Sequence, residues 1–352
     1  MMDRELVETT RKMIAAHLAA GRAVAELPIE RMKPPVQNML FEFVGNTPPA
    51  PIRDQWYRCS YCERNLQFRA GRIVLCADQL LRLIGEDCWV KHIENATWKA
   101  AKQDWAYYQK REAFNAIRAP LQRELATFGA DLRVTIQARG NVFRTYQNIG
   151  AVMRRQMQPL CDRLDRARRL GGNLTVERVL SSRQLELRRD ASRGQAVSQF
   201  EIVSLHRMQG LAILDEHDVA DDAIAVLPLI YEAAATLRDN HWERFTLRAL
   251  NHQTTELYAK IRTVADAVTQ ANAVLRHLRS FYSGENLQGL QAWSEDPDCD
   301  LCLDGSLSVT PTAIIFEDNA GRRGEILRPD SSAIEPWPDA SSLLDLVKRG
   351  SA

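Results

Sequence analysis

Hydrophobic positions recur every three or four residues along most of the chain, which is the period of an amphipathic helix. The clearest stretch is the seam at 247–282, where only Thr254 is polar (Leu247, Leu250, Thr254, Leu257, Ile261, Val264, Val268, Ala271, Leu275, Leu278, Tyr282). A period of 3.5 over about five heptads predicts a coiled-coil-like packing surface. We expect the stretch 221–283 to fold back on a second helical stretch, 174–214, as an antiparallel hairpin. Self-association of two chains through the seam is the alternative.

Further elements follow from the same periodicity and from the glycines and prolines that interrupt it. We expect helices over 3–22 (ending at Gly21), over 86–128 (with a kink or a restart at Pro120 and an end at Gly129) and over 141–170 (interrupted near Pro159). The alternation in 131–137, "DLRVTIQ", predicts a short strand. In 174–214 the apolar face is less regular (Val197, Phe200, Val203, Leu211, Leu214).

The pattern changes after Trp293 to short apolar runs separated by turn residues. "SLSVT", "AIIFED" and "GEILRP" predict three strands, and "DASSLLDLVKR" predicts a last helix capped by Asp339 or Ser341. The expected fold is therefore mainly α. It combines a small metal-binding module, an elongated helical or coiled-coil body with a helical hairpin, and a small C-terminal α+β unit. The expected domains are 1–50 (a helix and a Pro-rich connection), 51–95, 96–290 and 291–352.

Composition narrows the function classes. Hydrophobic residues make up 45% of the 352 residues and charged residues 26%, which is typical of globular proteins and argues against extensive disorder. The net charge of +1 gives no general electrostatic attraction to nucleic acid or to a membrane surface. No apolar run approaches the roughly 20 residues of a membrane helix, and the acidic residues early in the N-terminal stretch lead us to expect no export signal. Seven cysteines with two Cys-x-x-Cys pairs favour a reducing compartment, so we expect a cytoplasmic protein without a membrane partner.

The main chemical candidate lies in "RCSYCERNLQFRAGRIVLCADQLLRLIGEDCWVKH", residues 58–92. Zn²⁺ prefers four tetrahedral sulfur or nitrogen ligands, and closed structural sites often supply them as two short pairs. Cys59 and Cys62 form the first pair. Cys88 and His92, spaced i, i+4, would lie on one face of a helix and form the second. Cys76 is the alternative to His92 as the fourth ligand.

A Cys-x-x-Cys knuckle, a β-hairpin and two ligands at the start of a helix resemble the treble-clef zinc finger. The resemblance covers about 35 residues and implies a fold and a structural Zn²⁺ rather than an activity. The departure is Cys-x-x-x-His in the second pair, where treble clefs usually have Cys-x-x-Cys. Some treble-clef nucleases carry a catalytic histidine between the two pairs, and this sequence has none between Cys62 and Cys88. The sequence therefore predicts a closed, non-catalytic site.

An arginine-rich segment, 139–193, contains thirteen arginines, no lysine and five acidic residues. Six of these arginines could form one basic helical face that follows a phosphate backbone (Arg154, Arg155, Arg163, Arg166, Arg168, Arg169). The alternative is a solvated helix whose arginines pair with acidic residues, including those of the chain's own C-terminal part.

Two further groups could hold a metal but have simpler interpretations. Cys299 and Cys302 form a second Cys-x-x-Cys, but no cysteine or histidine follows, so we expect a turn with two free thiols. "DEHDVADD", 215–222, lacks calcium-loop spacing and is expected to be a solvated turn. Nucleotide-binding, zinc-protease and serine-hydrolase motifs are absent from the sequence. Trp89, Trp98 and Trp105 are expected to pack the metal module against the helical body.

Two functions fit these features. The first is a non-catalytic, zinc-stabilised helical adaptor that binds a partner protein. The second is a nucleic-acid-binding protein that uses the arginine-rich segment together with the zinc module. The sequence does not predict an enzyme.

Overall fold

A computed structural model describes residues 3–33, 41–52, 55–62, 67–85, 88, 95–192, 196–238, 242 and 245–351. Most of these residues are helical, so the prediction of a mainly α protein is confirmed. The chain divides into two compact units. Unit 1 comprises 1–117, 240–254 and 350–352, and unit 2 comprises 118–239 and 255–349. No helix in the described ranges combines the length and the low polarity that crossing a bilayer requires.

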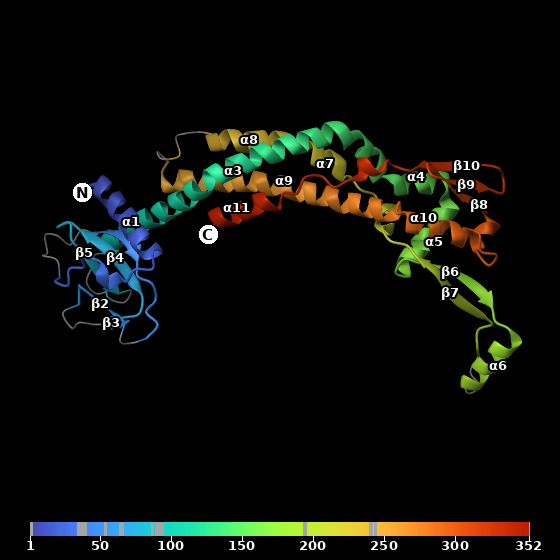
Figure 1. Ribbon diagram of the computed structural model, residues 1–352, viewed down its shortest axis with the longest axis horizontal. Coiled ribbons are helices and arrows are strands. Elements are labelled where there is room, and N and C mark those ends of the chain that lie inside the picture. Colours follow the sequence, from blue (N-terminus) through green and yellow to red (C-terminus); the bar gives the residue numbers. More distant parts are fainter. Residues whose placement is uncertain are drawn as a thin grey trace. The chain divides into compact units, whose positions relative to one another are not determined.

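Unit 1 is built on a three-stranded antiparallel sheet of order β1-β4-β5 (Figure 1). Its strands are β1 (Phe41–Asn46), β4 (Gly71–Cys76) and β5 (Leu81–Gly85). Both faces are covered, so the strands are almost continuously apolar rather than alternating. One face packs on helix α1, Arg4–Ala19, which begins and ends close to the predicted limits, and on the 3₁₀ turn η1, Val24–Glu26. The other face packs on the cysteine-bearing segment.

Two further elements of unit 1 pack against the buried clusters on either side of the sheet. A short hairpin pairs β2 (Tyr57–Arg58) with β3 (Gln67–Phe68). Helix α3, Asn95–Gln147, begins in this unit, and its Trp98 is buried against Phe43 with ring centroids 4.8 Å apart. The predicted packing role of Trp98 and Trp105 is confirmed, because both belong to or contact this core. Trp89 lies outside the described residues.

Helix α3 continues into unit 2 without a restart at Pro120 and without the predicted end at Gly129. Pro120 lies inside the helix, and Gly129 does not end it. Residues 131–137 are helical rather than a strand, with Leu132 buried and Val134 exposed, as the helical period requires. An isolated strand has no partner for its backbone groups, whereas a helix satisfies them internally. The predicted break near Pro159 is confirmed, because α4 (Ile149–Gln156) ends at Met157 and α5 (Gln158–Arg169) begins after it.

The predicted helix over 174–214 is wrong. The chain instead forms a two-stranded ribbon of β6 (Asn173–Val179) and β7 (Phe200–Arg207), with a short helix α6 (Ser182–Ala191) between the strands. We call β6, α6 and β7 together the arm. Both strands are rich in Val, Ile and Thr, whose branched side chains favour extended backbone. The hairpin expected between 174–214 and 221–283 is therefore absent.

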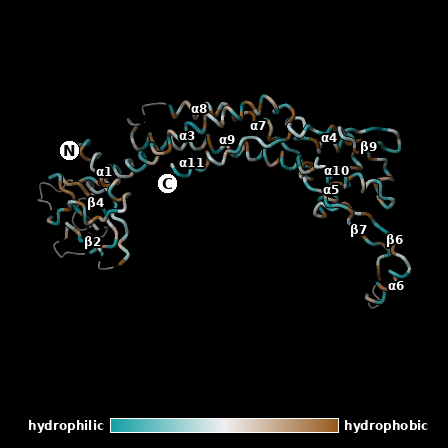
Figure 2. Tube along the Cα trace, in the orientation of Figure 1, coloured by the Kyte–Doolittle hydropathy of each residue, from teal (hydrophilic) through white to brown (hydrophobic). Residues whose placement is uncertain are grey.

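The antiparallel helical pair of unit 2 is formed by α8 and α9 (Figure 1). After the arm, η4 (Leu211–Leu214) and α7 (Val219–Ala225) lead to α8 (Leu227–Arg238) and α9 (Leu247–Phe281). Lys260 of α9 contacts Glu232 of α8 at 2.7 Å. The side chains of the predicted seam from Leu250 to Tyr282 are all buried within this one chain. In Figure 2 hydrophobic and hydrophilic residues alternate along α3, α8 and α9, as expected when each helix buries one face.

The C-terminal part matches its prediction. Helix α10 (Gly284–Ser294) and the turn η6 (Asp300–Leu303) lead into three antiparallel strands, which are β8 (Gly305–Val309), β9 (Ala313–Asp318) and β10 (Arg323–Leu327). After η7 (Ser331–Ile334), the last helix α11 (Ser341–Ser351) follows Asp339, whose carboxylate accepts a hydrogen bond from the Ser341 amide at 3.0 Å.

Candidate metal centre

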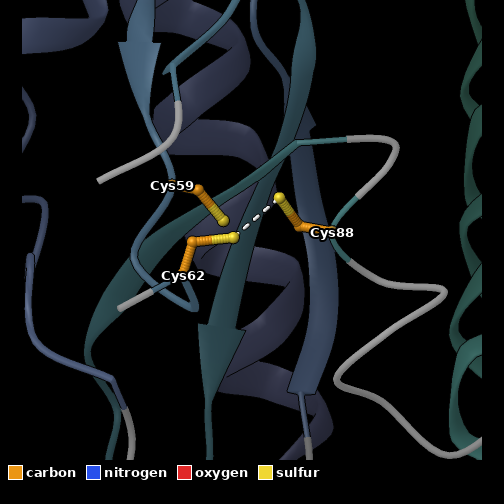
Figure 3. A group of neighbouring side chains, drawn as sticks. All are labelled: Cys59, Cys62 and Cys88. Atoms are coloured by element: carbon orange, nitrogen blue, oxygen red, sulfur yellow. Dashed lines mark hydrogen bonds between the residues drawn. The ribbon is translucent and has the colours of Figure 1, made fainter. Parts of the chain in front are cut away.

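Three cysteines of unit 1 converge on one point (Figure 3). Cys59 and Cys62 come from the turn that follows β2, and Cys88 lies three residues beyond the end of β5. Their sulfur atoms all lie within 4.8 Å of one another, and the Cys62 and Cys88 sulfurs are 2.9 Å apart. Three soft donors at these separations can bind a single metal ion. The structure thus brings together three of the four ligands predicted from spacing.

Ser60 explains why the two cysteine segments meet. Its backbone amide donates to the Leu83 carbonyl at 2.9 Å, and its hydroxyl oxygen accepts from the Leu83 amide at 3.2 Å. The same hydroxyl donates to the Glu30 carbonyl at 2.8 Å. These bonds fix the Cys59–Cys62 turn to β5, the strand that leads to Cys88. The Cys-x-x-Cys spacing then turns both sulfurs toward the third.

Aromatic rings cover the thiols. Phe41, Phe43, Tyr61 and Trp98 belong to the same buried cluster as Cys59 and Cys88. Phe41 packs against Tyr61 with ring centroids 6.4 Å apart. This apolar surrounding excludes water from most of the site, although Cys62 remains partly exposed.

Burial and the neighbouring thiols oppose ionisation of the Cys88 thiol unless a cation is bound. Burial, followed by the neighbouring thiols of Cys62 and Cys59, raises the pKa of the Cys88 thiol. Ionising three clustered thiols would place like charges in an apolar environment, which is costly unless a cation compensates. A bound metal ion reverses this balance, because it stabilises thiolates directly.

The structure describes only one of the two candidates for the fourth ligand. His92 lies outside the described residues and stays a prediction. Cys76 is buried at the end of β4, and its sulfur lies 3.2 Å from the Tyr61 hydroxyl. It is not among the thiols within 4.8 Å of one another, and burial raises the pKa of its thiol.

The other predicted metal candidates do not assemble into such a group. Within the described ranges, Cys59, Cys62 and Cys88 are the only three cysteine, histidine or acidic residues placed to share an ion. Cys299 precedes the 3₁₀ turn η6 and Cys302 lies within it, and both are free thiols. In "DEHDVADD", Asp215 and Asp221 instead pair with arginines.

The six predicted nucleic-acid arginines lie on α4 and α5, and the chain's own acids engage four of them. Arg163 contacts Asp300 at 2.9 Å and Asp304 at 2.8 Å, and Arg166 contacts Asp300 at 3.3 Å. The remaining pairs join Arg168 to Asp215 at 2.5 Å and Arg154 to Asp165 at 3.8 Å. Among the residues that the structure describes, Arg155 and Arg169 form no ion pair.

Sequence reasoning missed a buried charge on α1. Arg11 is only 4% exposed, donates to the Phe43 carbonyl at 2.8 Å and contacts Asp104 at 2.6 Å. Its position between Val7 and Ile14, at spacings of four and three, places it on the apolar face of the helix. The sequence signal that could have revealed this buried charge was an arginine on the apolar face of a predicted helix.

The cluster therefore has the donors, the spacing and the burial to hold a metal ion. Comparisons of the chain with protein-family models, with curated proteins and with solved structures found no match.

Proposed function

We propose that this protein is a non-catalytic adaptor, in which zinc stabilises unit 1 and unit 2 presents a surface to a partner protein. Zn²⁺ is assigned because three thiols form a soft donor set, and His92 is the proposed fourth ligand, with Cys76 as the alternative. The observation that carries the adaptor role is the exposed apolar face of the arm.

Strand pairing identifies that face. Val179 lies opposite Phe200, and Glu177 lies opposite Ile202, so these four side chains point to the same side of the ribbon. Val179, Phe200 and Ile202 are 73%, 49% and 67% exposed. The opposite side carries the buried Leu174 and Val176 and packs on α10. One side of the ribbon is thus anchored while the other presents apolar side chains to solvent.

Helix α6 adds a second argument. It has ten residues, none of which is buried, and Leu187 on it is also exposed. Isolated helices this short are marginal in water, and most helical stability in proteins comes from packing. In Figure 1 α6 lies at the far end of the ribbon, away from α10. A partner protein that covers the arm would supply the missing packing.

The ion pairs on α5 favour a protein partner over nucleic acid. Arginines already neutralised by aspartates contribute little to counterion release from a phosphate backbone. The exposed residues of the arm's free face are mainly apolar, which suits a protein interface.

The test uses affinity capture from the host with the full-length protein and the double variant Phe200→Ser/Ile202→Ser. The matched control is Leu303→Ser/Leu327→Ser, which removes two comparably exposed apolar side chains elsewhere in unit 2. We expect a protein partner that survives nuclease treatment, is depleted about tenfold by the arm variant and is retained by the control. Circular dichroism confirms that both variants are folded.

Three outcomes would contradict the proposal. They are the absence of any enriched protein, equal depletion by both variants, and loss of the captured material after nuclease treatment. Binding to a mixed-sequence DNA duplex that falls steeply between about 50 and 200 mM salt would support the nucleic-acid alternative instead.

A further inference from the structure

In unit 2, residues of α3 and α8 line an open cavity of about 630 Å³ at the protein surface. The helices approach closely at Gly129, where an added Cβ would lie 3.0 Å from the Ile230 side chain. On α3 the cavity is lined at 122, 126, 130, 133 and 137, and on α8 at 230, 234 and 238. These spacings of three and four place each set on one side of its helix, so the cavity is a groove that follows both helices.

The floor of the groove combines small and apolar side chains. Ala126, Ala130 and Ala234 leave room for a ligand to approach the two helix backbones. Val134 and Tyr231 lie beside them and are 64% and 48% exposed, although both are large. Small residues between exposed large ones form a surface into which the side chains of a third helix can pack.

The charged residues that line the groove are all basic. Its lining includes Arg133 and Arg238 and contains no acidic residue. Neither arginine forms an ion pair within the described part of the chain, unlike most arginines of α5. Two uncompensated guanidinium groups beside an apolar floor favour a ligand that carries carboxylates next to its apolar residues.

We propose that the α3–α8 groove binds an acidic amphipathic helix of the partner protein. Apolar residues spaced i, i+3/i+4, i+7 would lie on the alanine floor, and flanking Asp or Glu residues would pair with Arg133 and Arg238. The proposal rests on the adaptor function, and it adds the chemistry of one partner segment and the surface that receives it. The groove is separate from the exposed face of the arm, so the two surfaces can be tested independently.

The experiment measures fluorescence anisotropy of two labelled peptides of about 18 residues with the full-length protein. Both peptides carry leucines at helical spacing and differ only in having Glu or Lys at the flanking positions. We expect the Glu peptide to bind the wild-type protein at least tenfold more tightly than the Lys peptide. The double variant Arg133→Glu/Arg238→Glu should reverse this preference, and Ala130→Trp should remove binding by filling the groove.

The matched control is Arg123→Glu/Arg262→Glu, which reverses two exposed arginines outside the groove. It should keep the wild-type preference. The groove assignment is wrong if neither peptide binds, if the control and the groove variant behave alike, or if the Lys peptide binds more tightly. Displacement of the Glu peptide by a long-chain fatty acid, or binding of the labelled protein by a second copy of itself, would also overturn it. If the groove variants fail this test while the arm variant still loses its captured partner, the adaptor function stands without this helix site.

Discussion

Arg11 of α1 and Asp104 of α3 form an ion pair at 2.6 Å that joins two helices of unit 1. The Arg11 guanidinium also lies 4.7 Å from the Tyr108 ring centroid and 5.5 Å from that of Trp105. The side chain is therefore enclosed by a carboxylate, a backbone carbonyl and two aromatic rings. A buried arginine with this number of partners positions α1 against the start of α3.

Replacing Arg11 with Met should destabilise unit 1. The change leaves the Phe43 carbonyl and Asp104 without their partner, and we expect a loss of about 2–3 kcal/mol in unfolding free energy. This value is below the ~3–5 kcal/mol typical of a fully buried pair, because the Asp104 side chain is 45% exposed. Urea denaturation of the wild type, Arg11→Met and the exposed control Arg4→Met measures the effect. Equal midpoints for all three would contradict it.

Glu42, on β1 beside this pair, should make stability depend on pH. Burial raises its pKa above the ordinary value of 4.5; the nearby Asp104 raises it further and Arg11 lowers it. Its buried Oε2 has no hydrogen-bond partner and lies 3.9 Å from Arg11. Because the folded state holds the proton more tightly, the contribution of this carboxyl group to stability is complete below pH 4.5 and is lost as pH rises through its folded-state pKa.

Glu42→Gln removes this dependence. We expect the variant to have a higher Tm than the wild type at pH 7 and the two proteins to converge below about pH 4.5. Thermal denaturation monitored across this pH range measures the difference, with the exposed Glu5→Gln as the control. A Tm difference that grows as pH falls would show that the sign is wrong.

The cysteine cluster predicts the metal content of the purified protein. We expect one zinc per chain by elemental analysis, and loss of the metal in Cys59→Ala, Cys62→Ala and Cys88→Ala. Cys302→Ala is the control, because that thiol is exposed and outside the cluster. His92→Ala and Cys76→Ala, compared through the absorption of the cobalt-substituted protein, identify the fourth ligand.

Removal of the metal should unfold unit 1 and leave the helices of unit 2 intact. Binding of structural zinc contributes folding free energy directly, so a strong chelator acts as a local denaturant. Hydrogen exchange before and after chelation resolves the two units. A metal-free chain with full protection of β4 and β5 would contradict the structural role of the metal.

Two neighbouring glycines before the arm should respond differently to alanine. Both have positive φ, at +72° for Gly171 and +93° for Gly172. A Cβ on Gly172 would lie 2.4 Å from the Met208 carbonyl oxygen, whereas one on Gly171 meets nothing within 4 Å. Gly171→Ala should therefore cost about 1 kcal/mol from backbone strain, and Gly172→Ala clearly more. Equal denaturation midpoints for the two variants would contradict this difference.

The burial of the 247–282 seam predicts a monomer. Its apolar residues pack inside one chain and leave no seam for a second copy. Light scattering after size exclusion should give a mass near 40.0 kDa at all concentrations tested. A concentration-dependent species of twice that mass would support the self-association alternative.

The sequence by itself determined the elements whose signals are local. Residues 3–22 and the 247–282 seam have enough regular helical period to predict their helices, and the C-terminal strands are separated by turn residues. The Cys59–Cys62 pair and Cys88 also belong to this class. Their spacing in the sequence indicated that they share a metal ion, with a chance grouping as the alternative. The structure brings the three sulfur atoms together.

Tertiary structure decided the rest, because these features depend on distant partners. Apolar residues of 174–214 fit a helix or a ribbon, and the packing of Leu174 and Val176 on α10 selects the ribbon. Pro120 remains helical because the buried side chains around it, such as Leu121, contribute more than the lost hydrogen bond costs. Arg163 finds Asp300 and Asp304 more than 130 residues away, a pairing that no local pattern encodes. Likewise, the α3–α8 groove lies where Gly129 approaches Ile230, two residues far apart in the sequence.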